Sequence, residues 1–207
     1  MIHEINNPII KHKLAQLRNK NTASKDFREL VEEISMLLTY EVAKNFDMQT
    51  VEIETPIKSC RVEVLNENNF VVVPILRAGL AMTGGVLKML PNASVGLVGL
   101  YRNEKTFEPV EYFFKMPPRF AEKTLIVVDP MLATGGSASA ALQLLKNHGA
   151  KKIFFLCIVS APRGIEKLSA DHPDIPIYTA AIDEGLNKNC YIVPGLGDAG
   201  DRIFNTL

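Results

Sequence analysis

The sequence predicts an α/β protein built on a parallel sheet with helices on both faces. From residue 70 onward, short and continuously apolar segments alternate with helical segments, a pattern typical of strands that are buried on both sides. The chain has 207 residues, of which 47% are hydrophobic and 22% charged, an ordinary globular composition with enough chain to bury a core. Its unusual glycine-rich and charged residues follow the predicted strands, at the edge where parallel sheets bind their ligands.

The first 46 residues are predicted to be helical. Asn7 followed by Pro8 is typical of an N-cap and a first helical position. Ser24 is expected to cap a longer helix. The stripe along that helix is apolar except at one glutamate, and comprises Phe27, Leu30, Val31, Ile34, Leu37, Leu38, Glu41 and Val42. Residues 50–64 then change to an alternating pattern, which predicts a β-hairpin or arm.

The α/β part follows in regular order. Apolar strands are expected at 70–74, 95–101, 124–128, 153–159 and 175–180, and helices near 80–90, 137–148 and 165–171. We expect one domain over 1–207, divided into an N-terminal part (1–69), an α/β core (70–182) and a C-terminal segment (183–207).

Composition excludes several classes of protein. Lys plus Arg and Asp plus Glu are 23 each, and zero net charge is a poor match for a nucleic-acid partner. The longest apolar run, 70–76, is too short to span a membrane and contains a proline. The N-terminus lacks the apolar stretch of a signal peptide. We therefore expect a cytoplasmic protein that binds neither nucleic acid nor a membrane.

The three cysteines are expected to form neither a disulfide framework nor a zinc site. Cys60, Cys157 and Cys190 are odd in number and scattered, which fits neither a disulfide framework nor a zinc site. Cys157 and Cys190 are predicted to lie in the core. Asp183-Glu184-Gly185 is predicted to be a turn, with an active-site wall as the lesser alternative.

The strongest chemical signal is the segment 125–137, which runs LIVVDPMLATGGS. An apolar strand ends in Asp129, and a Thr-Gly-Gly-Ser turn then opens a helix. Gly135 and Gly136 allow close backbone approach, and free N–H groups at a helix start bind phosphate. Thr134 and Ser137 can add hydroxyl donors, while Asp129 can accept from two vicinal ribose hydroxyls. The simpler interpretation is an ordinary turn with Ser137 as an N-cap.

Two further segments can contribute to the binding of an anionic ligand and of a polar ligand edge. Arg77, Ala78 and Gly79 follow the first core strand, and an arginine there can bind a diphosphate in bidentate fashion. Residues 195–200 spell G-x-G-x-x-G, but only seven residues follow, so a dinucleotide-binding unit does not fit. A glycine-rich loop can instead present backbone N–H and C=O groups to a ligand.

Together these segments resemble the type I phosphoribosyltransferases, and most closely their uracil branch, over nearly the whole chain. The segment Asp-Pro-Met-Leu-Ala-Thr-Gly-Gly-Ser is similar to that branch's motif for phosphoribosyl diphosphate (PRPP). The general motif has a second acidic residue where this chain has Pro130. The uracil branch has the same proline, so this departure favours that branch within the family. It also leaves more of the ribose contact to Asp129.

The resemblance implies a type I phosphoribosyltransferase fold and transfer of the 5-phosphoribosyl group from PRPP to N1 of uracil, giving UMP and diphosphate. It places a strained cis peptide at Arg77–Ala78 and assigns the C-terminal segment to the base. Asp129, Arg77, Arg102 and Asp198 would be the catalytic contacts. The implied PRPP-binding residues are Arg77, Ala78, Gly79, Arg102, Asp129, Pro130, Met131, Leu132, Ala133, Thr134, Gly135, Gly136, Ser137 and Asp198, and those for uracil are Ile192, Gly197, Asp198 and Ala199.

The resemblance also implies cofactors and partners. Mg²⁺ would arrive mainly with PRPP, with no direct protein ligand assigned. A homodimer or larger homo-oligomer is expected, and GTP is an effector in some members. Lys105, near Arg102, is a weaker candidate contact. Two alternatives stay open: a regulator of the same fold that binds RNA or protein, and a phosphoribosyltransferase for another base.

Overall fold

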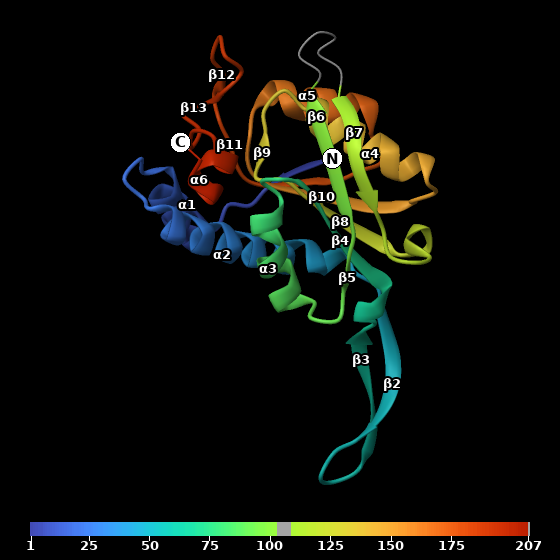
Figure 1. The fold of residues 1–207 in the computed structure, drawn as a ribbon. Helices are drawn as coiled ribbons and strands as arrows, with labels where there is room; N and C mark the ends of the chain where they lie inside the picture. The colour runs from blue at the N-terminus through green and yellow to red at the C-terminus, as the bar shows by residue number, and fades with distance from the viewer. Residues whose placement is uncertain (103–108, 207) are drawn as a thin grey trace.

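A mostly parallel sheet forms the centre of the protein (Figure 1). The computed structural model describes residues 1–102 and 109–206, with backbone alone at 101, 102 and 109. In this part the strand order is β1-β11-β10-β8-β4-β6-β7, with β5 beside β4 and β9 beside β10. The bounds are β1 Ile2–Glu4, β4 Phe70–Leu76, β5 Ser94–Val95, β6 Leu97–Arg102, β7 Pro109–Lys115, β8 Thr124–Val128, β9 Met131–Leu132, β10 Lys152–Ser160 and β11 Ile177–Ile182. Within this sheet β7 pairs antiparallel with β6, and the other pairs are parallel.

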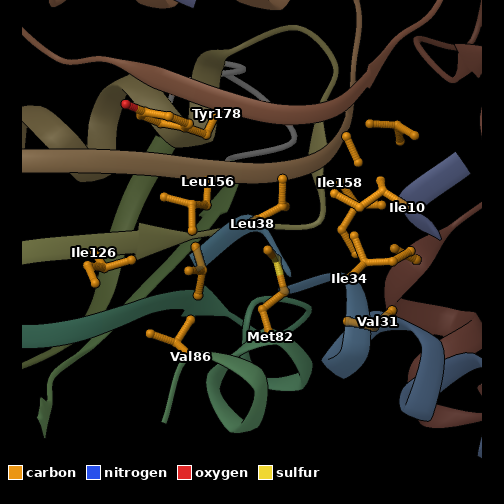
Figure 2. Packing of buried hydrophobic residues seen from close by; sticks show 14 of the residues in the cluster. Ile10, Val31, Ile34, Leu38, Met82, Val86, Ile126, Leu156, Ile158 and Tyr178 are labelled. Carbon is orange, nitrogen blue, oxygen red and sulfur yellow. The ribbon is translucent and has the colours of Figure 1, made fainter. Parts of the chain in front are cut away.

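Helices cover both faces, as predicted. α1 (Pro8–Arg18), α2 (Ser24–Val42) and α3 (Leu80–Met89) pack on one face, and α4 (Gly136–Asn147) and α5 (Pro162–Asp171) on the other. Alternation along β4 explains this: Val72 joins the first apolar cluster, while Val71 and Val73 join the second. Figure 2 shows the first cluster, where side chains of α1, α2 and α3 meet those of β8 and β10. A strand buried on both faces therefore has to be apolar throughout.

The N-terminus differs from the prediction in two places. Residues 2–4 were predicted to be helical, but they form edge strand β1 beside β11, with Ile2 opposite Ile177. The open edge of β11 supplies backbone partners that a local pattern cannot show. Ser24 is the first residue of α2 and not its cap; Ala23 holds the N-cap position without a side-chain bond. The cap at Asn7 is confirmed, because its Oδ1 accepts from the Ile9 N–H at 2.8 Å.

The predicted arm is confirmed as a hairpin of β2 (Met48–Glu54) and β3 (Ser59–Leu65), which projects away from the body (Figure 1). In the described part of the chain, short 3₁₀ turns occur outside the main elements at η1 (Ala43–Asn45), η2 (Glu67–Asn69) and η3 (Phe120–Glu122). Across the described residues, no helix is long and apolar enough to cross a membrane.

The C-terminal segment returns to the sheet edge where the parallel strands end. It forms β12 (Gly185–Leu186), β13 (Ile192–Val193) and α6 (Ala199–Phe204). Figure 1 shows this segment beside α1, so the C-terminal segment and the first helix lie next to each other. The fold thereby gathers the chemically unusual segments of the sequence.

Candidate active site

The loop after β8 is attached to the neighbouring strand β10. The Asp129 N–H donates to Leu156 C=O at 3.1 Å, and Pro130 C=O accepts from the N–H groups of Ile158 and Val159, both at 3.1 Å. Leu132 C=O accepts from the Ala161 N–H at 2.9 Å. These bonds keep the loop flat against the sheet, so that the Asp129 side chain stands at the strand tip.

The loop then enters α4 through a glycine that its backbone requires. Gly135 has φ +80°, and a Cβ there would lie 2.9 Å from Gly164 C=O. No side chain caps α4, so Ser137 is not its N-cap and the first N–H groups lack intrahelical partners. A cavity of about 100 Å³ opens at this helix start, and its lining comprises Asp129, Met131, Leu132, Ala133, Thr134, Gly135, Gly136, Ser137 and Ala138. The geometry is that of an anion site.

The loop after β4 makes a tight turn beside the same strand tip. Its non-proline cis peptide is Leu76–Arg77, so the expected position, Arg77–Ala78, is wrong by one bond. The chain already turns at residue 76, because the Gly79 N–H donates to Ile75 C=O at 3.0 Å. A Cβ on Gly79 would lie 2.5 Å from Val128 C=O. Glycine is therefore required for the close approach of this loop to β8.

The C-terminal loop has a backbone that few other sequences could adopt. Val193–Pro194 is a cis peptide, and Gly195 and Gly197 have φ of +61° and +81°. At Gly195 a Cβ would lie 2.1 Å from Ile192 C=O. Asp198 then caps α6, because its Oδ1 accepts from the Asp201 N–H at 2.9 Å.

These three loops enclose one cavity of about 450 Å³. Its lining comprises Arg77, Ala78, Asp129, Met131, Ala133, Asn189, Cys190, Tyr191, Ile192, Gly197, Asp198, Ala199 and Gly200. Asp129, Met131 and Ala133 also line the smaller cavity at α4, so the two cavities adjoin. Gly79 and Pro130 line neither cavity; they shape the loops from behind.

The surroundings of Asp129 and Arg77 affect what these two charged groups can do in the cavity. Burial raises the pKa of the Asp129 carboxyl to about 7, an effect only partly offset by the Met131 N–H that faces it. The Arg77 guanidinium carbon lies 5.4 Å from the centre of the Phe204 ring on α6. Arg77 therefore links the β4 loop to the C-terminal segment across the cavity.

Two predicted site residues, Arg102 and Lys105, lie wholly or partly outside the described part of the chain. Arg102 ends β6, at the same carboxyl edge of the sheet as Asp129, but its side chain is outside the described part. Lys105 lies outside the described residues altogether.

Sequence reasoning missed several residues of the site. Asn189, Cys190, Tyr191 and Gly200 line the large cavity. Cys190 was predicted to be buried, but it is exposed with φ +63°, at the tip of a turn. Asn187 builds that turn, since its Oδ1 accepts from the N–H groups of Asn189 and Tyr191. An asparagine at position 187 is a local signal of such a turn, because asparagine side chains often accept from N–H groups that follow them in the chain.

Asp183 is more than the residue of a simple turn. Its carboxylate is buried and pairs with Arg18 of α1, which lies 165 positions away in the chain. Cys157 is buried, as predicted.

Comparison with known proteins identifies relatives of the whole chain. Residues 4–206 match the uracil phosphoribosyltransferase family. The chain is 58% identical over 205 residues to a uracil phosphoribosyltransferase of Clostridium perfringens, covering 99% of this chain and 98% of the relative. It is 59% identical over 203 residues to that of Clostridium beijerinckii, covering 98% and 97%.

Solved structures agree at two levels of similarity. The AQ2163 protein of Aquifex aeolicus superposes with a TM-score of 0.94 at 38% identity, covering 99% of this chain and 98% of that one. An adenine phosphoribosyltransferase of Trypanosoma brucei shares the fold, with a TM-score of 0.59 at 13% identity over 95% and 88% of the two chains. With its type I phosphoribosyltransferase fold and full-length relatives, the chain belongs to the uracil phosphoribosyltransferase family.

Proposed function

We infer that this enzyme transfers the 5-phosphoribosyl group of PRPP to N1 of uracil, giving UMP and diphosphate in pyrimidine salvage. The observation that carries the assignment to one site is the shared cavity. It brings Arg77, Asp129 and the C-terminal loop around a single space at the ends of the parallel strands. The family match favours uracil over another base, and an enzyme over a regulator.

We propose that the 5-phosphate of PRPP binds at the start of α4. The uncapped N–H groups and the hydroxyls of Thr134 and Ser137 supply donors around the small cavity. Gly135 and Gly136 keep that approach open. Asp129, shared by both cavities, accepts from the ribose hydroxyls. Met131, Leu132 and Ala133 form the wall between the strand tip and the helix, and Pro130 supports it from behind through its bonds to β10.

The diphosphate of PRPP is assigned to the β4 loop and the end of β6. Arg77 can bind it in bidentate fashion once its side chain leaves Phe204. Ala78 lines the cavity beside Arg77, and Gly79 contributes by keeping the turn close to β8. Arg102 is proposed as the second arginine, on the evidence of its strand position alone. Two cations at the leaving group would stabilise the charge that develops as the C1–O bond breaks.

Uracil is assigned to the C-terminal loop. Its O2, N3–H and O4 edge reads acceptor, donor, acceptor, which complements a backbone N–H, C=O, N–H sequence. Ile192, Gly197, Asp198 and Ala199 all line the cavity. Within the described residues, neither the N–H nor the C=O of Gly197 takes part in a hydrogen bond. The loop therefore keeps backbone groups available for a base.

Catalysis then depends on positioning and charge. N1 attacks C1 of the ribose as diphosphate leaves, and the pocket holds both reactants in line. Asp198 lies where it can approach both the ribose and the base, but one of its oxygens caps α6. Its proposed catalytic role is electrostatic, through the oxygen that α6 does not use.

The donor set fits Mg²⁺ that arrives with PRPP. Across the described residues no group of three or more His, Cys, Asp or Glu side chains could hold a metal, whereas Asp129 and Asp198 line one cavity. Mg²⁺ commonly uses one or two carboxylates, substrate phosphates and waters. Bound in this way, it would neutralise charge on the departing diphosphate.

Domain division, assembly, regulation and location remain predictions. We propose one domain over 1–207, and a homodimer or larger assembly that uses the projecting β2–β3 hairpin. Sedimentation showing only a 22.9 kDa species at micromolar concentration would contradict the assembly.

GTP activation is tested by turnover with and without GTP. The cytoplasmic location also stays a prediction.

A panel of bases tests the function. Purified enzyme is incubated with PRPP and Mg²⁺ against uracil, cytosine, guanine, hypoxanthine and orotate, and nucleotide products are separated. We expect UMP from uracil and little product from the others. A larger rate with any other base would overturn the substrate assignment.

A further inference from the structure

A buried ion pair joins the end of α1 to the C-terminal segment. Arg18 Nη1 lies 2.7 Å from Asp183 Oδ2, and Nη2 lies 2.5 Å from Oδ1. The Asp183 side chain is 5% exposed and that of Arg18 23%. A paired geometry with so little solvent is far more orienting than a surface ion pair.

Both members of the pair also hold the backbone of Gly195. The Gly195 N–H donates to Asp183 Oδ2 at 2.8 Å, and Gly195 C=O accepts from Arg18 Nη1 at 2.7 Å. The Asp183 N–H is itself fixed to Ser160 C=O of β10 at 2.8 Å. The arrangement therefore ties one residue of the loop, through both of its backbone polar groups, to the central sheet and to α1.

A second arginine fixes the next carbonyl. Arg202 Nη1 donates to Leu196 C=O at 2.7 Å and Nη2 to Asn19 C=O at 2.6 Å. Its guanidinium carbon lies 4.2 Å from the centre of the Phe27 ring. Two successive carbonyls, those of Gly195 and Leu196, are thus engaged by arginines that do not line the cavity. They directly precede Gly197, whose backbone groups make no hydrogen bond among the described residues.

We propose that Arg18 and Asp183 are positioning residues that set the orientation of the base-binding loop. By consuming both polar groups of Gly195, they determine which backbone groups of residues 197–199 face the cavity. This inference rests on the proposed assignment of uracil to that loop. Neither Arg18 nor Asp183 lines the cavity, so both act through the loop and not on the substrate.

The consequence is an asymmetric effect on the two substrates. The proposed PRPP phosphate site is built by α4 and the β8 loop. The bonds that join Arg18, Asp183 and Gly195 do not involve these two segments, and the β8 loop is held by β10. Loosening Gly195 should therefore raise KM for uracil and leave KM for PRPP nearly unchanged. Misplacement of a reactant by about 1 Å can lower rates roughly 100-fold. We therefore expect the KM for uracil to rise by about 10- to 100-fold.

Three variants separate the contributions. Arg18→Met removes the guanidinium. Asp183→Asn can keep an acceptor for the Gly195 N–H, but it turns an amide donor toward Arg18. Arg18→Lys keeps the charge yet cannot bond Asp183 Oδ1 and Gly195 C=O with the same fork, so its uracil KM should lie between wild type and Arg18→Met.

The matched control is Lys13→Met. Lys13 is on the same helix and forms its own ion pair with Glu33 at 2.7 Å, but it does not contact the loop. We expect its KM values to match wild type, even if its melting temperature falls.

Initial rates over a grid of uracil and PRPP concentrations, together with thermal melting, give the result. A selective rise of uracil KM in Arg18→Met and Asp183→Asn, reduced in Arg18→Lys and absent in Lys13→Met, supports the proposal. Unchanged uracil KM, or parallel rises for both substrates, overturns it. If Arg18→Met does not fold, the two milder variants decide in the same way. Absence of uracil turnover by wild type would instead refute the proposed function.

Discussion

The proposed phosphate side and the proposed base side of the cavity are built in different ways. The phosphate side is local: Asp129, the glycine turn and the start of α4 lie within nine residues of chain, 129–137. The base side is assembled from distant parts: the C-terminal loop is held by Arg18 of α1 and by Asp183 after β11. A local unit can be recognised as a motif, whereas an assembled one depends on partners that no spacing reveals.

The largest expected effect is on the local side, at Asp129. Asp129→Asn keeps the shape but replaces a carboxylate acceptor with a weaker amide. Loss of a charge-assisted hydrogen bond costs ~1.5–3 kcal/mol, or roughly 10- to 150-fold in turnover. Steady-state kinetics measure the loss, and circular dichroism checks the fold. A folded variant within twofold of wild type would remove Asp129 from the reaction.

The arginines test whether the diphosphate belongs to the same side. Arg77→Ala and Arg102→Ala should each weaken PRPP binding by roughly 10-fold or more, and uracil binding much less. Isothermal titration with PRPP gives the affinities. Arg61→Ala, at an exposed position of the hairpin, is the control and should bind normally. Wild-type PRPP affinity in both site variants would contradict the assignment.

The raised pKa of Asp129 predicts how PRPP binding changes with pH. With a pKa of about 7 in the free enzyme, the carboxyl becomes protonated below that pH and loses its charge as an acceptor. The kcat/KM for PRPP should fall by about tenfold per pH unit on the acid side. PRPP also titrates, so Asp129→Asn is the control: it keeps the substrate's titration and should lose the enzyme's part of the slope.

The same shift has a consequence for stability. Because the folded-state pKa lies above the ordinary value of 3.8, the folded protein holds this proton more tightly than the unfolded chain. The stabilisation is present at low pH and is lost as pH rises from about 4 to 7. Asp129→Asn should therefore melt higher than wild type at pH 8, by more than at pH 5. An equal difference at both pH values would argue against the raised pKa.

The smallest effect is expected at two adjacent glycines at the start of α4. Gly135 has φ +80° and a crowded Cβ position, whereas a Cβ on Gly136 would meet only Thr134 Oγ1, at 3.8 Å. Gly135→Ala should lower the free energy of unfolding by ~1–2 kcal/mol, and Gly136→Ala should leave it nearly unchanged. Urea unfolding measures both. Equal losses would show that backbone conformation does not decide this turn.

The contrast explains what the sequence could predict. The core strands, the helices on both faces and the hairpin follow from local periodicity, and the motif at 129–137 carries its own chemistry. The edge strand β1 needs β11 as a partner, and the pair of Arg18 with Asp183 spans 165 positions, so neither has a local signal. Cys190 was misplaced because burial was inferred from residue type, while the Asn187 turn sets its exposure.

The central claim is that a backbone loop reads the uracil edge in a pocket shared with PRPP, and the selectivity between two pyrimidines tests it most directly. Cytosine presents an acceptor at N3 and a donor at its amino group, so two buried pairs would be mismatched. Sites built on such pairing reject the wrong partner by factors near ~10⁴. We predict that kcat/KM for uracil exceeds that for cytosine by about this factor, with 5-fluorouracil accepted. Cytosine turnover within about tenfold of uracil would contradict the account.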